Sequence, residues 1–315
     1  MTSRLDRVAG ALLGVHAGDS LGATVEFDSW EYINFRYPNG IREIVGGGVF
    51  EWAPGQATDD TDLTRAVLLA HLDPGQEIVI TAARNMLDWY EGRWPGRKPG
   101  SHPRDIGGAT AAGLVAFKRS GDPSTSGAGD GRAGNGSLMR CIPTALAVAD
   151  RDERIDHSMR ISAITHNDRR CTTACAAYNE IVAALIEGTS AADAVAIGKA
   201  IAIELAAPDV ADSISHGAQL DPAVLAATGQ TQLPDDGSGF VLDSLTLGVA
   251  ALLDSRPLAD VLIDIVRLGN DSDTNAAIAG GLLGARDGVD AIPEQWVSTL
   301  QFRDEFIRAA STLVG

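Results

Sequence analysis

Small apolar residues at helical spacing are the feature that most constrains the fold of this chain. Leu5, Val8, Ala9 and Leu12 fall on one helical face near the N-terminus, and comparable patterns recur to the end of the chain. Alanine and glycine let helices approach one another closely, and aromatic residues make up only 5% of the 315 residues. We therefore expect an all-α fold, a compact orthogonal helical bundle that forms one domain over residues 1–315.

The predicted helices are separated by three turn-rich segments. Residues 30–57 are rich in Gly and Pro and predict a long loop, with a short hairpin around residues 44–50. Residues 120–136 and 231–239 consist almost entirely of turn formers. Helical patterns cover the stretch from residue 60 to 71 and the following ranges: 4–17 (with Gly18 as a stop), 76–91, 106–119, 141–150, 155–165, 170–187, 190–206, 242–253, 257–267, 274–285 and 293–312.

The charge of the chain excludes some classes of partner. Lys and Arg number 25 against 42 Asp and Glu, so the net charge is −17. A surface this acidic repels nucleic acid and anionic membranes, and no apolar run is long enough to span a bilayer. An anionic substrate would therefore have to be received at a local positive feature, such as a metal ion or a helix N-terminus.

The cysteines and the N-terminal residues predict a cytoplasmic location. Cys141, Cys171 and Cys175 show no spacing typical of a disulfide framework, so we expect buried thiols in a reducing compartment. The first apolar stretch is interrupted by His16 and followed directly by Asp19, which argues against a signal peptide.

Two acidic clusters carry the strongest chemical signal. Thr58-Asp59-Asp60 and Asp271-Ser272-Asp273-Thr274 each stand where a helical pattern begins. Carboxylate and hydroxyl oxygens are hard ligands that suit Mg²⁺, Mn²⁺ or Ca²⁺. Helix capping is the alternative, because Asp and Thr are common N-cap residues. Capping, however, uses one residue per helix, and these clusters offer several oxygen-bearing side chains in succession.

Three further features are consistent with a ligand site but are weaker alone. Glycines in the segment Gly134-Asn135-Gly136-Ser137 would let a ligand approach the backbone, although most such segments are only turns. Arg140 could bind phosphate or tie this loop to an acidic neighbour. Glu26 follows a Gly-rich turn as a possible general base, with a solvated loop glutamate as the alternative. A lone histidine such as His166 is more often structural than catalytic.

These motifs together resemble those of the ADP-ribosylglycohydrolase family. The resemblance runs in order from about residue 5 to 300 and rests on GDSLGATVE, ATDDTDL, GNGSLMR, ITHND and GNDSDTNAAIAGGLLGA. Asn270 and Ser272 stand where family members often carry Gly and Thr, and Asp62 adds an acid beside the first cluster. None of these departures removes an expected ligand, but they leave the choice of metal open.

The resemblance implies an all-α fold around a central binuclear metal cleft that holds two Mg²⁺ or Mn²⁺ ions. It assigns the metal ligands to Thr58, Asp59, Asp60, Asp271, Asp273 and Thr274. It places Glu26 near the substrate ribose and makes Glu26 and Asp60 the expected catalytic residues. It assigns the binding of ADP-ribose to Gly134, Asn135, Gly136, Ser137, Met139 and His166, with the 231–239 loop as another wall.

The expected reaction is hydrolysis of a ribosyl glycosidic bond that joins ADP-ribose to an acceptor. The expected partner is an ADP-ribosylated protein or a small ADP-ribose conjugate, with arginine favoured by analogy as the acceptor. Alternatives are an ADP-ribosyl-serine or small-molecule hydrolase, a different metal-dependent hydrolase acting on phosphoanhydrides, and a non-catalytic ADP-ribose-binding or crystallin-like protein.

Overall fold

A computed structural model describes residues 2–73, 75 and 77–315, and it is built from helices. No strand occurs in these described ranges, which confirms the all-α prediction. The first half contains α1 (Arg4–Gly22), α2 (Trp30–Arg36), α3 (Asp59–Leu72), α4 (Ile78–Tyr90), α5 (Gly108–Ser120), η1 (Pro123–Thr125), α6 (Ile142–Ala147) and α7 (Arg151–Ala163). The second half contains α8 (Arg169–Ile186), α9 (Ala191–Glu204), α10 (Pro208–Gly217), α11 (Pro222–Thr228), α12 (Val241–Leu253), α13 (Leu258–Arg267), α14 (Ser272–Asp287), η2 (Val289–Ala291), α15 (Glu294–Thr299) and α16 (Arg303–Val314).

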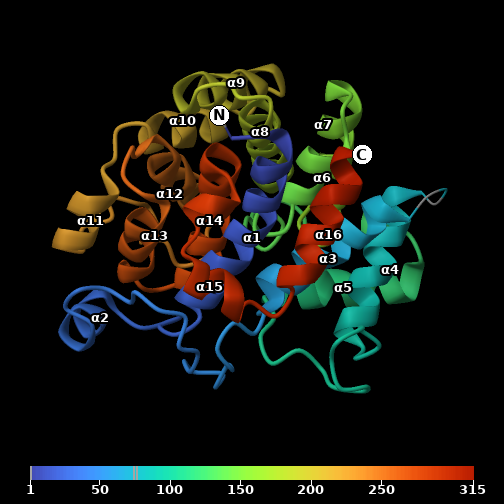
Figure 1. Ribbon diagram of the computed structural model, residues 1–315. Coiled ribbons are helices and arrows are strands. Elements are labelled where there is room, and N and C mark those ends of the chain that lie inside the picture. Colours follow the sequence, from blue (N-terminus) through green and yellow to red (C-terminus); the bar gives the residue numbers. More distant parts are fainter. Residues whose placement is uncertain (1, 74, 76) are drawn as a thin grey trace.

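The centre of the molecule is an antiparallel pair formed by α1 and α14, which lie side by side in Figure 1. Glycines at every fourth position of α1 face α14. A Cβ atom added at Gly14 would lie 2.1 Å from the Gly280 carbonyl oxygen, and one at Gly18 would lie 2.0 Å from the Ala276 carbonyl oxygen. The two backbones are therefore in direct contact, which only residues without a side chain allow. This is the close helix approach that the small residues predicted.

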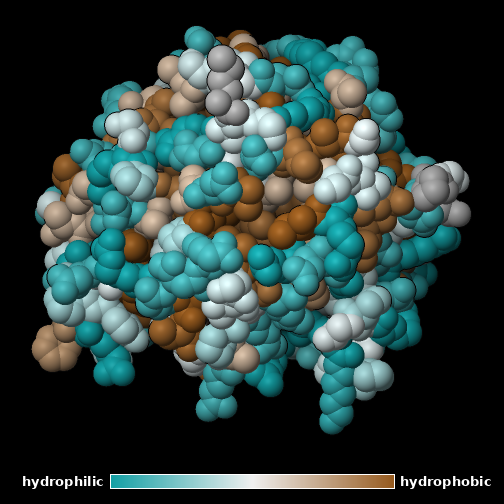
Figure 2. Space-filling view, in the orientation of Figure 1, coloured by the Kyte–Doolittle hydropathy of each residue, from teal (hydrophilic) through white to brown (hydrophobic). Residues whose placement is uncertain are grey.

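The other helices cover this pair on several sides. α8, α12 and α13 pack against α14, while α3 and α16 pack against α1. Among the described helices, none has the length and apolar character needed to cross a membrane. The face of the molecule in Figure 2 is mostly hydrophilic, as expected from the net charge, with a band of hydrophobic residues across its middle.

Several predicted boundaries were wrong because tertiary contacts override local signals. Gly18 does not end α1, which continues to Gly22 because its glycines pack on α14. The stretch predicted as a loop contains α2, whose N-cap Ser29 accepts a hydrogen bond from the Tyr32 N–H and whose Ile33 is buried. The predicted hairpin is reduced to a single bridge between Gly47 and Trp52.

Later in the chain, two helices were missed and one was predicted as too long. α10 and α11 begin at Pro208 and Pro222, and proline in the first turn is a recognised start signal. The stretch 293–312 divides into α15 and α16, because the chain turns at Leu300 and the Gln301 N–H donates to the Gly55 carbonyl. Residue 76, the first of the predicted 76–91 helix, lies outside the described residues.

Candidate functional site

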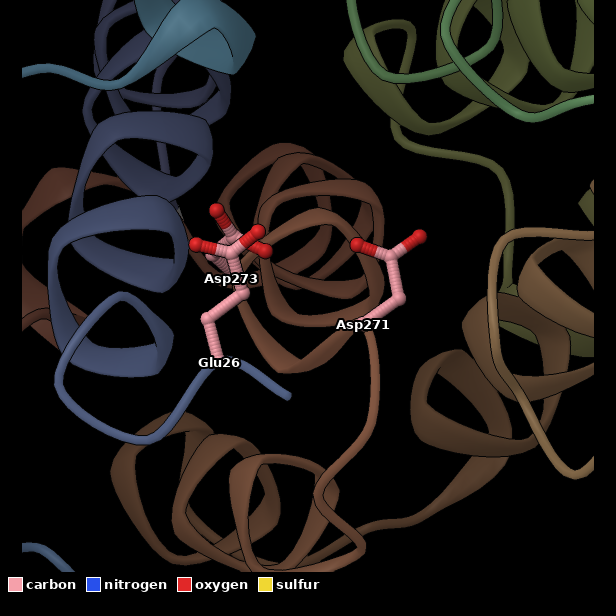
Figure 3. A group of neighbouring side chains, drawn as sticks. All are labelled: Glu26, Asp271 and Asp273. Atoms are coloured by element: carbon pink, nitrogen blue, oxygen red, sulfur yellow. The ribbon is translucent and has the colours of Figure 1, made fainter. Parts of the chain in front are cut away.

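The α1–α14 pair brings Glu26 to the acidic start of α14. The Ser272 hydroxyl donates to the Gly22 carbonyl across 2.9 Å, which joins the end of one helix to the beginning of the other. One carboxylate oxygen each of Glu26, Asp271 and Asp273 lies within 4.8 Å of the others. Figure 3 shows Glu26 reaching this cluster from the segment after α1, Asp273 projecting from the first turn of α14, and Asp271 projecting from the residue just before that helix. These three acids form a group that could hold a metal ion.

The first acidic cluster adjoins this group from α3. Thr58 is the N-cap residue of α3, and Asp59 and Asp60 form its first turn. The Thr274 hydroxyl lies 3.3 Å from Asp60 Oδ2 and so connects the two clusters. The other oxygen of Asp60, Oδ1, is buried and has no hydrogen-bond partner. The structure thus brings together all six residues expected to bind metal.

Helix capping accounts for only one of these side chains. Thr58 Oγ1 accepts from the Asp60 N–H across 3.2 Å, as a cap should. Asp271 occupies the N-cap position of α14 but makes no side-chain capping bond. The carboxylates of Asp59 and Asp60 likewise do not cap α3. Asp273 Oδ1 accepts from the Thr274 N–H in the first turn of α14 across 2.8 Å, but Asp59, Asp60 and Asp271 need another explanation than capping.

Crowding of buried carboxylates raises their pKa values. Burial raises the pKa of Glu26 to about 9, with repulsion from Asp105 and Asp271 adding to the effect. The pKa values of Asp59, Asp60 and Asp273 are also raised well above the ordinary value, mainly by burial and then by the neighbouring acids. Without compensating positive charge, Glu26 would hold its proton at neutral pH. Hard cations fit the cluster, because they satisfy the unpartnered oxygens and offset this repulsion.

A cavity of about 410 Å³ opens above the acidic cluster. Asp59, Asp271 and Thr274 line its acidic part, whereas Thr58, Asp60 and Asp273 do not line it and are almost fully buried. The remainder of the lining comes from Glu26, Phe27, Asp105, Ile106, Gly107, Gly108, Ala109, Thr110, Gly134, Asn135, Gly136, Met139, His166, Ser238, Gly239 and Asn270.

The glycine loop has a more structural role than the sequence indicated. The Asn135 backbone N–H donates to the Gly239 carbonyl, and its side-chain amide donates to Asp271 Oδ2 across 2.6 Å. Ser137 does not line the cavity, because its hydroxyl is buried and accepts from Ser162. Asn135 therefore connects the loop to the acidic cluster, and the cavity surface of the loop comes from Gly134, Asn135 and Gly136.

His166 lines the cavity as a neutral imidazole whose ring is held by Thr165. Arg140 donates to Thr165 Oγ1 across 2.7 Å, and the same oxygen lies 2.8 Å from His166 Nδ1. A guanidinium can only donate, so the Thr165 hydroxyl accepts from Arg140, and its contact with Nδ1 fixes the orientation of the imidazole ring. Burial and then Arg140 lower the pKa of His166 to about 3. Arg140 itself is fully buried, so it serves the loop and Thr165 instead of a phosphate or an acidic neighbour.

Sequence reasoning missed two acids at this site. Asp105 lines the cavity just before α5, and burial raises its pKa. Asp19 is fully buried under α3, where its Oδ2 accepts from the backbone N–H groups of Thr58 and Thr61. Neither residue belongs to an acidic cluster in the sequence. The only local signal for Asp105 was its position directly before a helical pattern. Asp19 lies within the GDSLGATVE motif.

Comparison with known proteins gives one consistent result. The family model described as ADP-ribosylglycohydrolase matches residues 1–315. The chain is 31% identical to the ADP-ribosyl-(dinitrogen reductase) glycohydrolase of Rhodospirillum rubrum, over 95% of this chain and 92% of the relative. It is 30% identical to ADP-ribosylarginine hydrolase Tri1 of Pseudomonas putida (strain GB-1), over 98% of this chain and 78% of the relative.

A solved structure supports the same assignment at the level of fold. A chain titled ADP-ribosylglycohydrolase-related protein complex superposes with a TM-score of 0.80 and 27% sequence identity, covering 99% of this chain and 98% of its own length. Motif order, fold and whole-chain similarity therefore agree, and this chain belongs to the ADP-ribosylglycohydrolase family.

Proposed function

We propose that this chain removes ADP-ribose from arginine side chains of a modified protein by hydrolysing the N-glycosidic bond. Family membership makes it a hydrolase of ADP-ribosyl glycosidic bonds, and the name of the Pseudomonas putida relative supports arginine as the acceptor. One observation carries the proposal. Glu26 and two acidic clusters meet at a single cavity, whose wall also contains the glycine loop and a neutral His166.

The acidic residues fit two divalent cations, Mg²⁺ or Mn²⁺. Thr58, Asp59, Asp60, Asp271, Asp273 and Thr274 supply oxygen donors from two helix starts that are in contact through Thr274 and Asp60. Bound cations would supply the positive charge that keeps these carboxylates ionised and attracts the ribose hydroxyls. All of these donors lie within residues 58–274 of one continuous fold, which supports a single domain over residues 1–315.

The residues of the chain itself account for the remaining requirements of the reaction. Cleavage builds positive charge at the anomeric carbon, which nearby carboxylates stabilise. Glu26 Oε2 is buried without a hydrogen-bond partner, so it is free to accept the proton of an attacking water. A ring nitrogen of His166 can hydrogen-bond an oxygen of ADP-ribose, and Gly134 and Gly136 leave the room that the His166 ring needs beside the cavity.

A product assay tests the proposal. The purified protein is incubated with ADP-ribosyl-arginine, ADP-ribosyl-serine or ADP-ribose, with Mg²⁺, Mn²⁺ or chelator, and the products are identified by mass spectrometry. We expect free ADP-ribose and arginine in the presence of either metal. Cleavage of the serine conjugate alone would reassign the acceptor, and AMP as a product would indicate a phosphoanhydride hydrolase.

Replacing Glu26 with glutamine should separate binding from turnover. The amide keeps the shape of the side chain but cannot accept a proton, so kcat should fall by roughly a hundredfold or more. ADP-ribose should still bind, because the glycine loop and His166 are unchanged. Kinetics on ADP-ribosyl-arginine and calorimetric titration with ADP-ribose would measure the two effects. An unchanged kcat would remove Glu26 from the catalytic step.

Stabilisation of the protein by Mn²⁺ should depend on pH. The pKa of Glu26 is raised to about 9 in the metal-free fold. Protonated Glu26 therefore contributes to the free energy of unfolding at low pH, and this contribution is lost as pH rises from about 4 towards 9. Cations offset the repulsion between ionised groups, whereas at low pH they must first displace protons. At a fixed concentration, Mn²⁺ should therefore raise the melting temperature more at pH 8 than at pH 6. A concentration of 100 times the Kd at pH 8 would raise the free energy of unfolding there by about 2.7 kcal/mol. An equal effect at both pH values would contradict the assignment.

A further inference from the structure

Phe27 is an unusual residue at the mouth of the cavity. It directly follows Glu26 and lines the cavity, yet its side chain is 62% exposed. Its backbone lies in the left-handed region, with φ of 65°, which residues other than glycine rarely adopt. An exposed phenyl ring on a strained backbone beside a catalytic carboxylate calls for a functional explanation.

Neighbouring residues hold this conformation in place. The Phe27 N–H donates to the Asn270 carbonyl across 2.7 Å, and the Asn270 N–H donates back to the Asp28 carbonyl across 2.9 Å. Asn270 also has a positive φ, of 55°, so two strained residues support one another beside the cavity. The backbone at Phe27 is therefore held in place by Asn270.

Two contacts connect the ring to the segment that contains Asp105, which also lines the cavity. It packs edge-on against Phe50, with ring centroids 6.2 Å apart. The Phe50 carbonyl in turn accepts a hydrogen bond from Arg104, the residue directly before Asp105. Glu26, Asp59 and Asp105 all line the cavity, so its surface favours a positive group.

We propose that the Phe27 ring is a platform on which the guanidinium of the acceptor arginine stacks, with the Asp105 carboxylate nearby. The inference rests on the proposed function, because it concerns the acceptor arginine, which leaves when the glycosidic bond is hydrolysed beside Glu26. A guanidinium is a planar, weakly hydrated cation that stacks well on aromatic faces, and surrounding carboxylates strengthen that preference. Phe27 is thus a specificity-determining residue for the acceptor and does not contact the ADP portion.

Three substitutions of Phe27 test how much its aromatic ring contributes to activity. Phe27→Ala, Phe27→Leu and Phe27→Tyr all retain a side chain, so the cost of the left-handed backbone is similar in each. We expect Phe27→Ala and Phe27→Leu to lower kcat/KM for ADP-ribosyl-arginine by about tenfold, and Phe27→Tyr to stay near wild type. Phe35→Ala is the matched control, because Phe35 is 87% exposed on α2 and does not line the cavity.

Inhibition by ADP-ribose, which lacks the acceptor, gives the second readout. Its inhibition constant should be the same for wild type and all Phe27 variants. A wild-type kcat/KM in Phe27→Leu would overturn the stacking assignment, as would an equal loss of ADP-ribose affinity in Phe27→Ala. An effect seen only with a modified protein, and not with free ADP-ribosyl-arginine, would also overturn it. If the wild-type protein itself does not cleave ADP-ribosyl-arginine, the proposed function fails first, and that result is recognisable without any variant.

Discussion

Asp273→Asn is expected to abolish hydrolysis of ADP-ribosyl-arginine while leaving the metal-free protein at least as stable as the wild type. Asp273 is 1% exposed and lies within the acid group formed with Glu26 and Asp271. The amide has nearly the same shape, so the core is not disturbed. It removes one anionic oxygen donor, however, and we expect kcat to fall by about a thousandfold.

The stability half of this prediction follows from the electrostatics of the site. Burial and repulsion from Glu26, Asp60 and Asp271 raise the pKa of Asp273, so the wild-type fold is destabilised when this group ionises. A neutral side chain avoids that cost. The matched control is Asp130→Asn, which makes the same charge change at an exposed position. Thermal unfolding without metal and steady-state kinetics with Mn²⁺ would measure both effects, and retained turnover in Asp273→Asn would refute the metal assignment.

Gly14→Ala is expected to destabilise the fold by disrupting the α1–α14 contact. Alanine normally stabilises a helix by about 1 kcal/mol relative to glycine. Here the added Cβ atom would lie 2.1 Å from the Gly280 carbonyl oxygen, far inside van der Waals contact. The helices must move apart, and we expect a net loss of about 2–3 kcal/mol in the free energy of unfolding.

The same change should reduce activity, because α1 and α14 carry the acidic site at their ends. Separating them moves Glu26 away from Asp271 and Asp273. Gly129→Ala is the control, since nothing lies within 4 Å of a Cβ atom added there and its backbone is not left-handed. Chemical denaturation would measure the stability of both variants. A Gly14→Ala protein as stable as wild type would show that the helix contact tolerates a side chain.

Much of the secondary structure could be predicted because helical periodicity is a local property. The helix that begins at Asp59 was placed correctly, since its cap and its apolar face both lie within one stretch of sequence. The continuation of α1 beyond Gly18 was not predictable in this way. Glycine is a poor helix residue in isolation, and only the surface of α14 makes it the favoured residue at that position.

Some residues of the site could likewise be identified from local sequence, whereas others depend on tertiary contacts. Asp59, Asp60, Asp271 and Asp273 were identified because several acids stand together at helix starts. Asp105 was missed, because its part in the site depends on loop 91–107 reaching the start of α3. The role of Asn135 likewise became clear only from its contact with Asp271, which is 136 residues away in the chain.

The sequence by itself determined the all-α class, most of the helices, the acidic clusters and the family, since each of these depends on residues close together in the chain or on motif order. The tertiary structure alone decided which acids meet, that Thr165 holds the ring of His166, and that Phe27 stands at the mouth of the cavity. The physical reason is that burial, repulsion and hydrogen-bond direction depend on distances between side chains. Those distances are fixed here by the direct backbone contact of α1 with α14.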